Sequence, residues 1–367
     1  MLILRQVAAL LVCLVLLYIA VLGMTLALAR PPSQRGELDS SLAGGTIFMT
    51  EPKYIYLNRT PLGDASNKIV FVGSSNVATG FKLSKIRALL PVGVRVHKLA
   101  VGGANMTEMR QVIDLVQEVQ SEDARRHEIL VLGIWYGMFG KDRLRWYTSD
   151  RFPGDTDIDI ERYRYGFEWR TSHGPIRIVP WRYVDLAVSA VSPFLVLDKL
   201  SRDTLAWLSN AYSGPPRDLD AVVLSEARKK SLLDYWLKTM GPAGTGTMDE
   251  QFSVLEQACA TVLSQGSSLL LVNLPLPKWH KERSPYEQPY QHAVARLVSR
   301  WTGRPGFGFI DMTKLDSDGD FYDEVHPKPH VTIEWAKRLA AALSPLAAPE
   351  ASVAGTVSDT LPRSRIR

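Results

Sequence analysis

The sequence is poor in cysteine and lacks any block of like charge, and these two absences argue against several classes of protein. Only two cysteines occur in 367 residues, Cys13 inside an apolar run and Cys259 inside a helical pattern. A disulfide framework or a thiolate metal site is therefore not expected. The formal net charge is +5, with lysine and arginine interspersed among acidic residues, which disfavours nucleic acid as the partner. Hydrophobic residues make up 46% of the chain, which is ordinary for a globular protein with a substantial core.

Long apolar runs are equally scarce, and one run alone is long enough to cross a bilayer. Residues 7–29 read VAALLVCLVLLYIAVLGMTLALA, without a charge, and Arg30 and Pro31 follow them. This length predicts a transmembrane helix. The small residues at 27–29 are also typical of a signal-peptide cleavage site, so an anchor and a cleaved signal both stay open. We predict a single-pass protein of the cytoplasmic (inner) membrane whose remaining residues lie on the extracytoplasmic, periplasmic side.

The rest of the chain divides by composition. Residues 30–66 are rich in proline, glycine and serine and predict a linker, with order beginning near Lys68. Residues 67–345 predict a single α/β domain. Residues 346–367 are rich in alanine, proline, serine and threonine and predict a disordered tail. The function is therefore expected within residues 67–345.

Short apolar runs alternate with helix-length patterns along this domain. The runs predict buried parallel strands at 68–73, 94–101, 128–135, 267–277 and 307–312. Between the second and third run, one helical face is formed by Met109, Val112, Val116 and Val119. Similar patterns occupy DEQFSVLEQACATVLSQG, YQHAVARLVSRW and VTIEWAKRLAAAL, the last with Ile333, Ala336, Leu339 and Leu343 inward. Strand, helix, strand repeated predicts a three-layer α/β/α fold with a parallel sheet.

One segment, residues 138–245, breaks the alternation. It is rich in tryptophan, tyrosine and arginine and ends in the helical pattern LSEARKKSLLDYWLKTM. Because an unstructured loop of this length is uncommon, we predict a large insertion or subdomain. Its aromatic residues either stack on a sugar or form a small hydrophobic core.

A group of small polar residues follows the first predicted strand. In KIVFVGSSNVATGF, the apolar run stops at Gly73, Ser74, Ser75 and Asn76. In an open parallel sheet, ligands gather at the carboxyl ends of the strands. A serine at this edge acts as a nucleophile if a base reaches it, and otherwise serves as the N-cap of the next helix.

The segment DFYDEVHPKPH near the other end of the chain supplies a base. Asp323 and His326 are three residues apart, so the carboxylate can hold one imidazole nitrogen while the other faces outward. These are the acid and base of a hydrolase triad, although an exposed polar turn has the same pattern. His330 does not form a metal pair with His326, because Pro327 and Pro329 interrupt a helix there. No metal and no cofactor are predicted.

Together these motifs resemble the SGNH, or GDSL-like, hydrolase superfamily over residues 68–136 and 267–343. On that pattern, Ser75 matches the nucleophile of the first block and Gly103, in LAVGGANMT, matches the glycine of the second block. Asp323 and His326 match the last block. The resemblance implies a flavodoxin-like three-layer fold, a Ser75–His326–Asp323 triad, and an oxyanion site formed by the N–H groups of Ser75 and Gly103.

The sequence departs from that family in two blocks. Ser74 stands where an aspartate is frequent, and Trp135, in GIWYG, stands where an oxyanion asparagine is usual. Loss of one oxyanion donor costs on the order of a hundredfold or more in rate. Asn76 and Asn105 are the candidates to replace that donor. We assign Trp135 and Tyr136 to substrate binding.

The single anchor, the Gly-Ser-Ser block, the missing asparagine and the insertion resemble, more narrowly, the DltD-like and alginate- or cellulose-acetylation branches. This resemblance implies an acyltransferase or acylesterase that acts on O-acyl groups, with acetyl as the expected group, of a cell-surface polysaccharide or a teichoic-acid-like polymer. It also implies a membrane-bound O-acyltransferase as partner. The alternative is a catalytically weak polysaccharide-binding or scaffold subunit of an exopolysaccharide acylation and export complex. Transfer and hydrolysis are not distinguished by the sequence.

Overall fold

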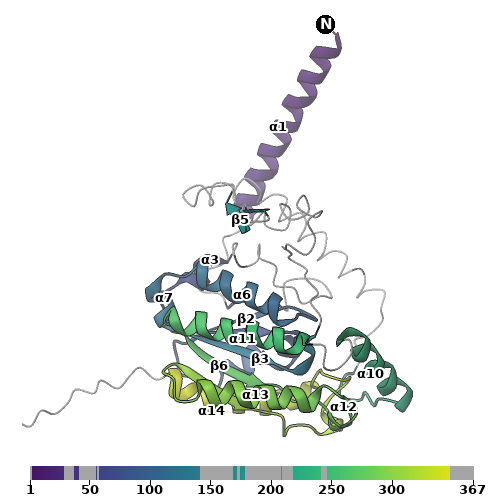
Figure 1. Ribbon diagram of the computed structural model, residues 1–367. Coiled ribbons are helices and arrows are strands. Elements are labelled where there is room, and N and C mark those ends of the chain that lie inside the picture. Colours follow the sequence, from purple (N-terminus) through teal and green to yellow (C-terminus); the bar gives the residue numbers. More distant parts are fainter. Residues whose placement is uncertain are drawn as a thin grey trace, which may run out of the picture.

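A computed structural model of the protein describes residues 2–28, 37–40, 55, 58–140, 168–171, 174–177, 208, 218–240 and 246–347. The predicted tail beyond residue 347 and most of the aromatic part of the insertion lie outside these residues. Helix α1 (Leu2–Leu28) stands apart from an α/β domain (Figure 1). Its residues Ile3–Gly23 are long and apolar enough to cross a membrane, and a signal sequence near an N-terminus fits the same description.

The domain is built around a parallel sheet of five strands in the order β2-β1-β3-β6-β7. The strands are β1 (Lys68–Gly73), β2 (Arg95–Ala100), β3 (Glu128–Ile134), β6 (Ser268–Asn273) and β7 (Phe307–Asp311). Each lies in one of the predicted apolar runs. Every residue of β1 and β3 is buried, because both faces of the sheet are covered and the strands read as continuous apolar runs. A separate antiparallel hairpin, β4 (Glu168–Thr171) and β5 (Gly174–Arg177), belongs to the insertion.

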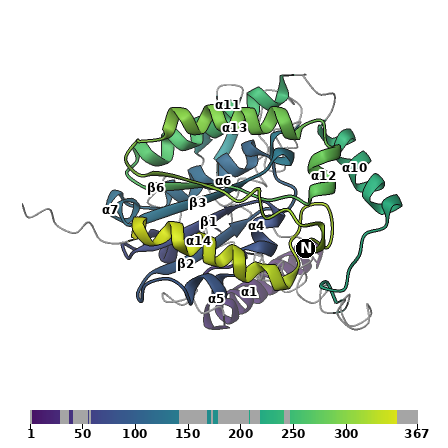
Figure 2. The ribbon, with the colours of Figure 1, turned by 90° about the horizontal axis from the view of Figure 1, so that it is seen from below.

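Helices cover both faces of the sheet, which confirms the predicted α/β fold. Figure 2 shows α11 (Thr247–Ser264) and α13 (Glu287–Trp301) on one side and α14 (Thr332–Ala347) with α5 (Leu83–Arg87) on the other. Helix α6 (Met106–Glu118) packs against α11, and the short helix α4 (Ser75–Gly80) packs against β1 and β2. The other helices within the described residues are α3 (Arg59–Gly63), α7 (Glu122–Arg126), α10 (Glu226–Met240), α12 (Lys278–Arg283) and the 3-10 helices η2 (Tyr136–Phe139), η3 (Asp318–Asp320) and η4 (Pro329–Val331).

The predicted inward face of α14 needs one correction. Ala336, Leu339 and Leu343 are buried as expected, whereas Ile333 is 40% exposed. At 3.6 residues per turn, a buried stripe that also includes Trp335 leaves Ile333 at its margin, in the first turn of the helix.

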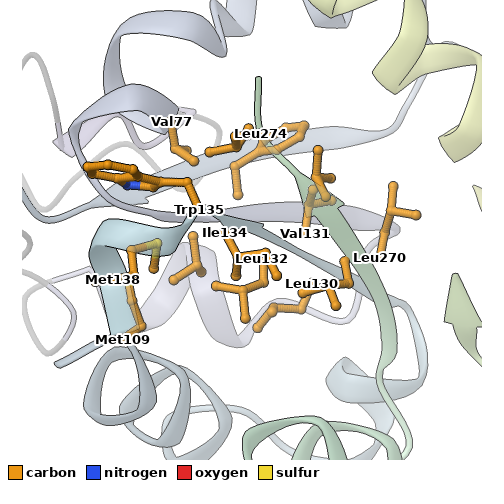
Figure 3. Close-up of a cluster of buried hydrophobic side chains, with 14 of the residues drawn as sticks. Val77, Met109, Leu130, Val131, Leu132, Ile134, Trp135, Met138, Leu270 and Leu274 are labelled. Carbon is orange, nitrogen blue, oxygen red and sulfur yellow. The ribbon is translucent and has the colours of Figure 1, made fainter. Parts of the chain in front are cut away.

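The hydrophobic core extends to the carboxyl edge of the sheet. Figure 3 shows part of a continuous cluster that joins Val77 of α4, Trp135 after β3 and Leu274 after β6 with side chains of β3. The elements that follow the strands are therefore packed on the core rather than held as free loops.

The predicted linker, residues 30–66, contains residues that belong to the domain. The backbone of Asp39 pairs in parallel with Lys98 of β2, and the Lys98 N–H donates to the Leu38 carbonyl at 2.7 Å. The Ala100 N–H donates to Ser40 Oγ at 2.9 Å. Order therefore does not begin at Lys68, because the outer N–H groups of the edge strand β2 find acceptors in residues 37–40.

Candidate active site

Two glycines allow the nucleophile candidate to sit directly on the end of the sheet. Gly73 of β1 lies opposite Gly133 of β3, and a Cβ atom on either residue would collide with the Val77 side chain of α4. Helix α4 therefore approaches the strand ends closely, and Ser75 is its first residue. The strand order reverses between β1 and β3, and this is the point where open α/β sheets bind ligands.

The structure brings Ser75, His326 and Asp323 together from opposite ends of the domain. Ser75 Oγ lies 2.7 Å from His326 Nε2, and His326 Nδ1 lies 2.6 Å from Asp323 Oδ2. An ionised carboxylate only accepts hydrogen bonds, so Nδ1 carries the proton and Nε2 is left to accept the Ser75 hydroxyl. The predicted three residues thus form a continuous chain from a hydroxyl through an imidazole to a carboxylate.

The loop that carries the imidazole is held by its own backbone. Asp323 Oδ1 accepts the N–H groups of Val325 at 3.0 Å and His326 at 2.8 Å, so both carboxylate oxygens are used. The Tyr322 N–H donates to the His326 carbonyl at 3.1 Å, and the two rings stack with 5.5 Å between centroids. These contacts orient the imidazole before any ligand binds.

Helix α4 and the histidine loop also contact each other directly. A Cβ atom on Gly80, at the end of α4, would overlap the Trp335 ring and lie 3.2 Å from Pro327 Cγ. Lys98 adds a second constraint, because its Nζ donates to the carbonyls of Ala78 and Phe81 at 3.0 Å each. The helix that begins with Ser75 is thus fixed at its far end.

Electrostatic interactions favour the ionised form of Asp323, the carboxylate at the end of the Ser75–His326–Asp323 chain. Burial alone would raise the pKa of Asp323, but the hydrogen bond from His326 and the charge of that ring hold it below its ordinary value. The neighbouring Glu324 differs, since burial and then the charge of Asp323 raise its pKa. The pKa values of these two adjacent carboxyl groups therefore shift in opposite directions. Asp323, whose pKa is lowered, is the one suited to stabilise an imidazolium.

Backbone N–H groups gather at the same edge. The Ser75 N–H is among the first N–H groups of α4, which have no partner within their helix. Ala100 of β2 lies beside Gly73 of β1, so the turn after β2, which contains Gly103, belongs to this edge. Gly103 has a φ of 64°, a conformation that glycine adopts without strain.

The two asparagines predicted as oxyanion donors are buried, and their side-chain oxygens accept hydrogen bonds from other residues. Asn76 is completely buried and accepts the hydroxyl of Ser74, while its Nδ2 has no hydrogen-bond partner among the residues described. Asn105 is the N-cap of α6, with Oδ1 accepting the Glu108 N–H at 3.0 Å and Glu108 Oε2 accepting the Asn105 N–H at 3.2 Å. A buried amide and a capping amide are poorly placed to meet a substrate oxygen.

The assignment of Trp135 and Tyr136 to substrate binding was wrong. Trp135 is 3% exposed and Tyr136 is fully buried, and a side chain without exposed surface does not stack on a sugar. Trp135 Nε1 instead donates to Ser74 Oγ at 3.0 Å. The Tyr136 hydroxyl contacts His280 Nε2. Both aromatic side chains are therefore buried beside the site and bond to residues that hold it.

Other residues near the site were not singled out from the sequence. His280 Nδ1 donates to the Glu324 carbonyl at 2.7 Å, and Trp236 Nε1 donates to Glu324 Oε1 at 3.0 Å. Glu324 stood inside the recognised Asp-x-x-His motif, which was the available signal. Trp236 offered none, because it lies in the insertion, 88 residues from its partner.

His330 is the other histidine of the loop, and its partners are acidic. Its Nδ1 lies 2.7 Å from Asp220 Oδ1, and its Nε2 lies 3.6 Å from Asp320 Oδ1. Within the described part of the chain, no group of three or more histidine, cysteine or acidic side chains is arranged to hold a metal ion. His330 therefore ties residues 218–222 of the insertion to the histidine loop.

Comparison with known proteins gives distant likenesses only. No family model and no curated protein matches the chain. Among solved structures, it is similar to a catalytic mutant of an acetylxylan esterase from Geobacillus stearothermophilus, with 13% identity and a TM-score of 0.37 over 76% of this chain and 94% of that chain. It is also similar to a family two carbohydrate esterase from Clostridium thermocellum in complex with cellohexaose, with 11% identity and a TM-score of 0.35 over 76% of this chain and 63% of that chain. Likenesses at this level carry no conclusion about activity, so the function is argued from the site itself.

Proposed function

We propose that this protein is a serine acylesterase or acyltransferase that uses Ser75, His326 and Asp323. The proposal is carried by one observation, the pair of short contacts that joins Ser75 Oγ to His326 Nε2 at 2.7 Å and His326 Nδ1 to Asp323 Oδ2 at 2.6 Å. A structural serine N-cap needs no imidazole, and an exposed polar turn needs no serine. The arrangement matches the geometry that activates a hydroxyl nucleophile.

The reaction follows from the order of these groups. The Ser75 hydroxyl gives its proton to His326 Nε2 as its oxygen bonds to the carbonyl carbon of an ester. Asp323 stabilises the imidazolium through Nδ1–H, and the N–H groups of Ser75 and Gly103 are assigned to the oxyanion. His326 then returns the proton to the departing alkoxide, which leaves as an alcohol, and the acyl group stays on Ser75.

The second half of the reaction releases the acyl group. Water or a sugar hydroxyl gives its proton to His326 and attacks the acyl-serine, and Ser75 leaves with that proton restored to its oxygen. Water yields a carboxylic acid and makes the protein an esterase. A sugar hydroxyl yields a new ester and makes it a transferase.

The substrate and place of action are proposed from the sequence resemblance. We assign the reaction to O-acyl groups, with acetyl as the first to test, on a cell-surface polysaccharide or a teichoic-acid-like polymer. The apolar helix α1 (Leu2–Leu28) supports a place beside a membrane, and the extracytoplasmic side is proposed from the resemblance. A membrane-bound O-acyltransferase is the proposed partner that supplies acyl groups.

One observation favours a second candidate function. Trp135 stands at the position where an oxyanion asparagine would serve, and its N–H is committed to Ser74 Oγ. With backbone donors alone, the expected rate is lower by on the order of a hundredfold. A polysaccharide-binding or scaffold subunit of an acylation complex is the alternative that this loss supports.

The two candidates are separated by the fate of an activated acetyl ester. The full-length protein in detergent is incubated with a chromogenic acetyl ester beside its Ser75→Ala variant, and intact mass reveals any acetyl adduct. Ser84→Ala, a substitution of an exposed serine on α5, is the matched control. The proposal expects turnover or an adduct in the wild type and in Ser84→Ala, and neither in Ser75→Ala. If all three proteins are folded and equally inert, simple esterase activity is excluded and the scaffold function is supported.

A further inference from the structure

One tryptophan of the insertion, Trp236, contacts a neighbour of each half of the candidate triad. The ring of Trp236 packs edge-on against Trp135, with 4.7 Å between centroids and 80° between planes. Its Nε1 donates to Glu324 Oε1 at 3.0 Å. Trp135 belongs to the nucleophile side and Glu324 to the base side, so Trp236 lies at the junction between the two.

On the nucleophile side, Trp135 connects Trp236 to the residue that precedes Ser75. Trp135 Nε1 donates to Ser74 Oγ at 3.0 Å, and Ser74 immediately precedes Ser75. Ser74 in turn donates its hydroxyl to Asn76 Oδ1. The side chain of Ser74 makes no cap bond to α4, so these two contacts determine where the turn into Ser75 lies.

On the side of His326, Trp236 contacts Glu324, the residue next to Asp323 in the chain. Glu324 follows Asp323 and is itself 8% exposed. Its backbone carbonyl accepts His280 Nδ1 at 2.7 Å, and its side chain accepts Trp236. A buried carboxyl group that lost its donor would be costly to keep in place, so the indole N–H fixes this part of the loop.

Helix α10 also contacts α12, through the Glu226–Arg283 ion pair at 2.9 Å and through Lys229 Nζ, 5.8 Å above the Trp279 ring. Its buried residues are Leu232, Trp236 and Met240, which lie on one stripe, while most of the helix is exposed. Trp236 is the middle anchor of that stripe. The Trp236 indole combines ring packing with a directed hydrogen bond to Glu324, and it adds to the contact that Asp220 of the insertion makes with His330.

Building on the proposed function, we propose that Trp236 is a positioning residue that holds the Ser75 turn and the Asp323–His326 loop at reacting distance. Nucleophile and base come from residues that are 251 positions apart in the chain, and a misplacement of about 1 Å is enough to cost on the order of a hundredfold in rate. Trp236 thus contributes to catalysis through Trp135 and Glu324, without touching the substrate.

The test removes the indole N–H and keeps an aromatic ring. Full-length Trp236→Phe, in detergent, is treated with a fluorophosphonate, whose phosphorus bonds to Ser75 Oγ as fluoride leaves, and labelling is followed by intact mass. We expect the limiting labelling rate to fall by about tenfold to a hundredfold, with the half-saturating reagent concentration unchanged. Trp301→Phe is the matched control, because Trp301 is also buried and its Nε1 has no hydrogen-bond partner among the residues described.

A second readout does not depend on reactivity. The His326 Nδ1–H bonded to Asp323 is observed as a downfield proton resonance, assigned through its loss in Asp323→Asn. We expect this resonance to shift or broaden in Trp236→Phe and to stay in place in Trp301→Phe. If the wild type is not labelled at all but the resonance responds in this way, the proposed function fails and the positioning role of Trp236 stands.

The proposal is overturned if Trp236→Phe is folded, labels at the wild-type rate and leaves the resonance unchanged. If Trp236→Phe does not fold, Glu324→Met tests the same junction from its other side, because it removes the acceptor and keeps both indole rings. Slow labelling and a perturbed resonance in folded Glu324→Met support the proposal. Wild-type behaviour of that variant, by both readouts, contradicts it.

Discussion

The two ends of strand β1 both carry polar side chains, yet they differ in what those side chains can do. At the amino end, Lys68 is 1% exposed and its Nζ donates to the carbonyls of Asp64 and Ala124. It lies beside Glu128 of β3, and burial lowers the pKa of Lys68 and raises that of Glu128. At the carboxyl end, Ser75 is half-buried and bonds to an imidazole.

The difference lies in where each network stops. The Glu128 carboxylate receives hydrogen bonds from Gln117, Gln120 and Ser267 and is sealed from solvent. The network at the other end stops at the Ser75 hydroxyl, on an edge that solvent reaches. A closed polar network contributes to fold and stability, whereas an open network that ends on the candidate nucleophile is the one suited to chemistry.

The largest effect is expected at the carboxyl end, from Asp323→Asn. The asparagine oxygen can still accept the N–H groups of Val325 and His326, but its amide faces His326 Nδ1 and favours the wrong imidazole tautomer. We expect the turnover of an activated ester to fall by roughly a thousandfold or more, with the thermal midpoint changed little. Steady-state kinetics and a melting curve measure the two quantities.

A nearby carboxylate provides the control for this substitution. Asp320→Asn changes an acid in the same loop that lies 3.6 Å from His330 and outside the chain to Ser75. It should retain turnover close to the wild type. Equal loss in both variants would mean that loop structure rather than the triad was disturbed.

The opposite pattern is expected at the amino end, from Lys68→Met. The substitution leaves the Glu128 carboxyl buried without the positive charge beside it, and the free energy of unfolding should fall by roughly 2–4 kcal/mol. Activity per folded molecule should be unchanged. Chemical denaturation and active-site-normalised turnover check the two statements.

The double variant Lys68→Met with Glu128→Gln sharpens this prediction. Because the second change removes the unpaired charge, part of the lost stability should return. A loss of turnover in folded Lys68→Met would show that the two ends of β1 are coupled, which the comparison does not predict.

Some features of the fold and of the candidate site could be predicted from the sequence, and others could not. The strands were predictable because buried parallel strands are contiguous apolar runs, and Ser75 and His326 were predictable because each follows such a run or lies in a short motif. The burial of Trp135 was not predictable, because a tryptophan after a strand fits a sugar platform as well as a core. Its role depends on Trp236, a contact made across the insertion that leaves no local pattern.

The docking of residues 37–40 was hidden for a different reason. An edge strand is paired through backbone N–H and carbonyl groups, which every sequence has. The composition of residues 30–66 is that of a linker throughout. The feature that marks residues 37–40 is the acidic side chain of Asp39, which pairs with Lys98. Asp39 Oδ2 lies 3.1 Å from Lys98 Nζ.

The smallest of the three effects is expected from Asp39→Asn, which tests whether this docked segment influences the helix of Ser75. Lys98 is 2% exposed at its side chain and Asp39 15%; burial lowers the pKa of Lys98 and the charge of Asp39 raises it. The variant should lose roughly 1–2 kcal/mol of unfolding free energy at neutral pH. Turnover should change little, because Lys98 still donates to the Ala78 and Phe81 carbonyls at the end of α4.

The pH dependence of that loss identifies its cause. Without the charge of Asp39, the folded-state pKa of Lys98 falls further, so the stability gap is complete below the folded pKa of the variant. The gap disappears as the pH rises through the folded pKa of the wild type, which itself lies below the ordinary lysine value of about 10.4. Denaturation curves of wild type and variant between neutral and alkaline pH should therefore converge.

Glu37→Gln is the control for this substitution. Glu37 pairs with Arg87 at 3.0 Å, and because the Arg87 side chain is 57% exposed, the loss of this pair should cost under about 1 kcal/mol. A gap between wild type and Asp39→Asn that stays constant with pH would assign the loss to the backbone pairing of residues 37–40 instead of the buried charge.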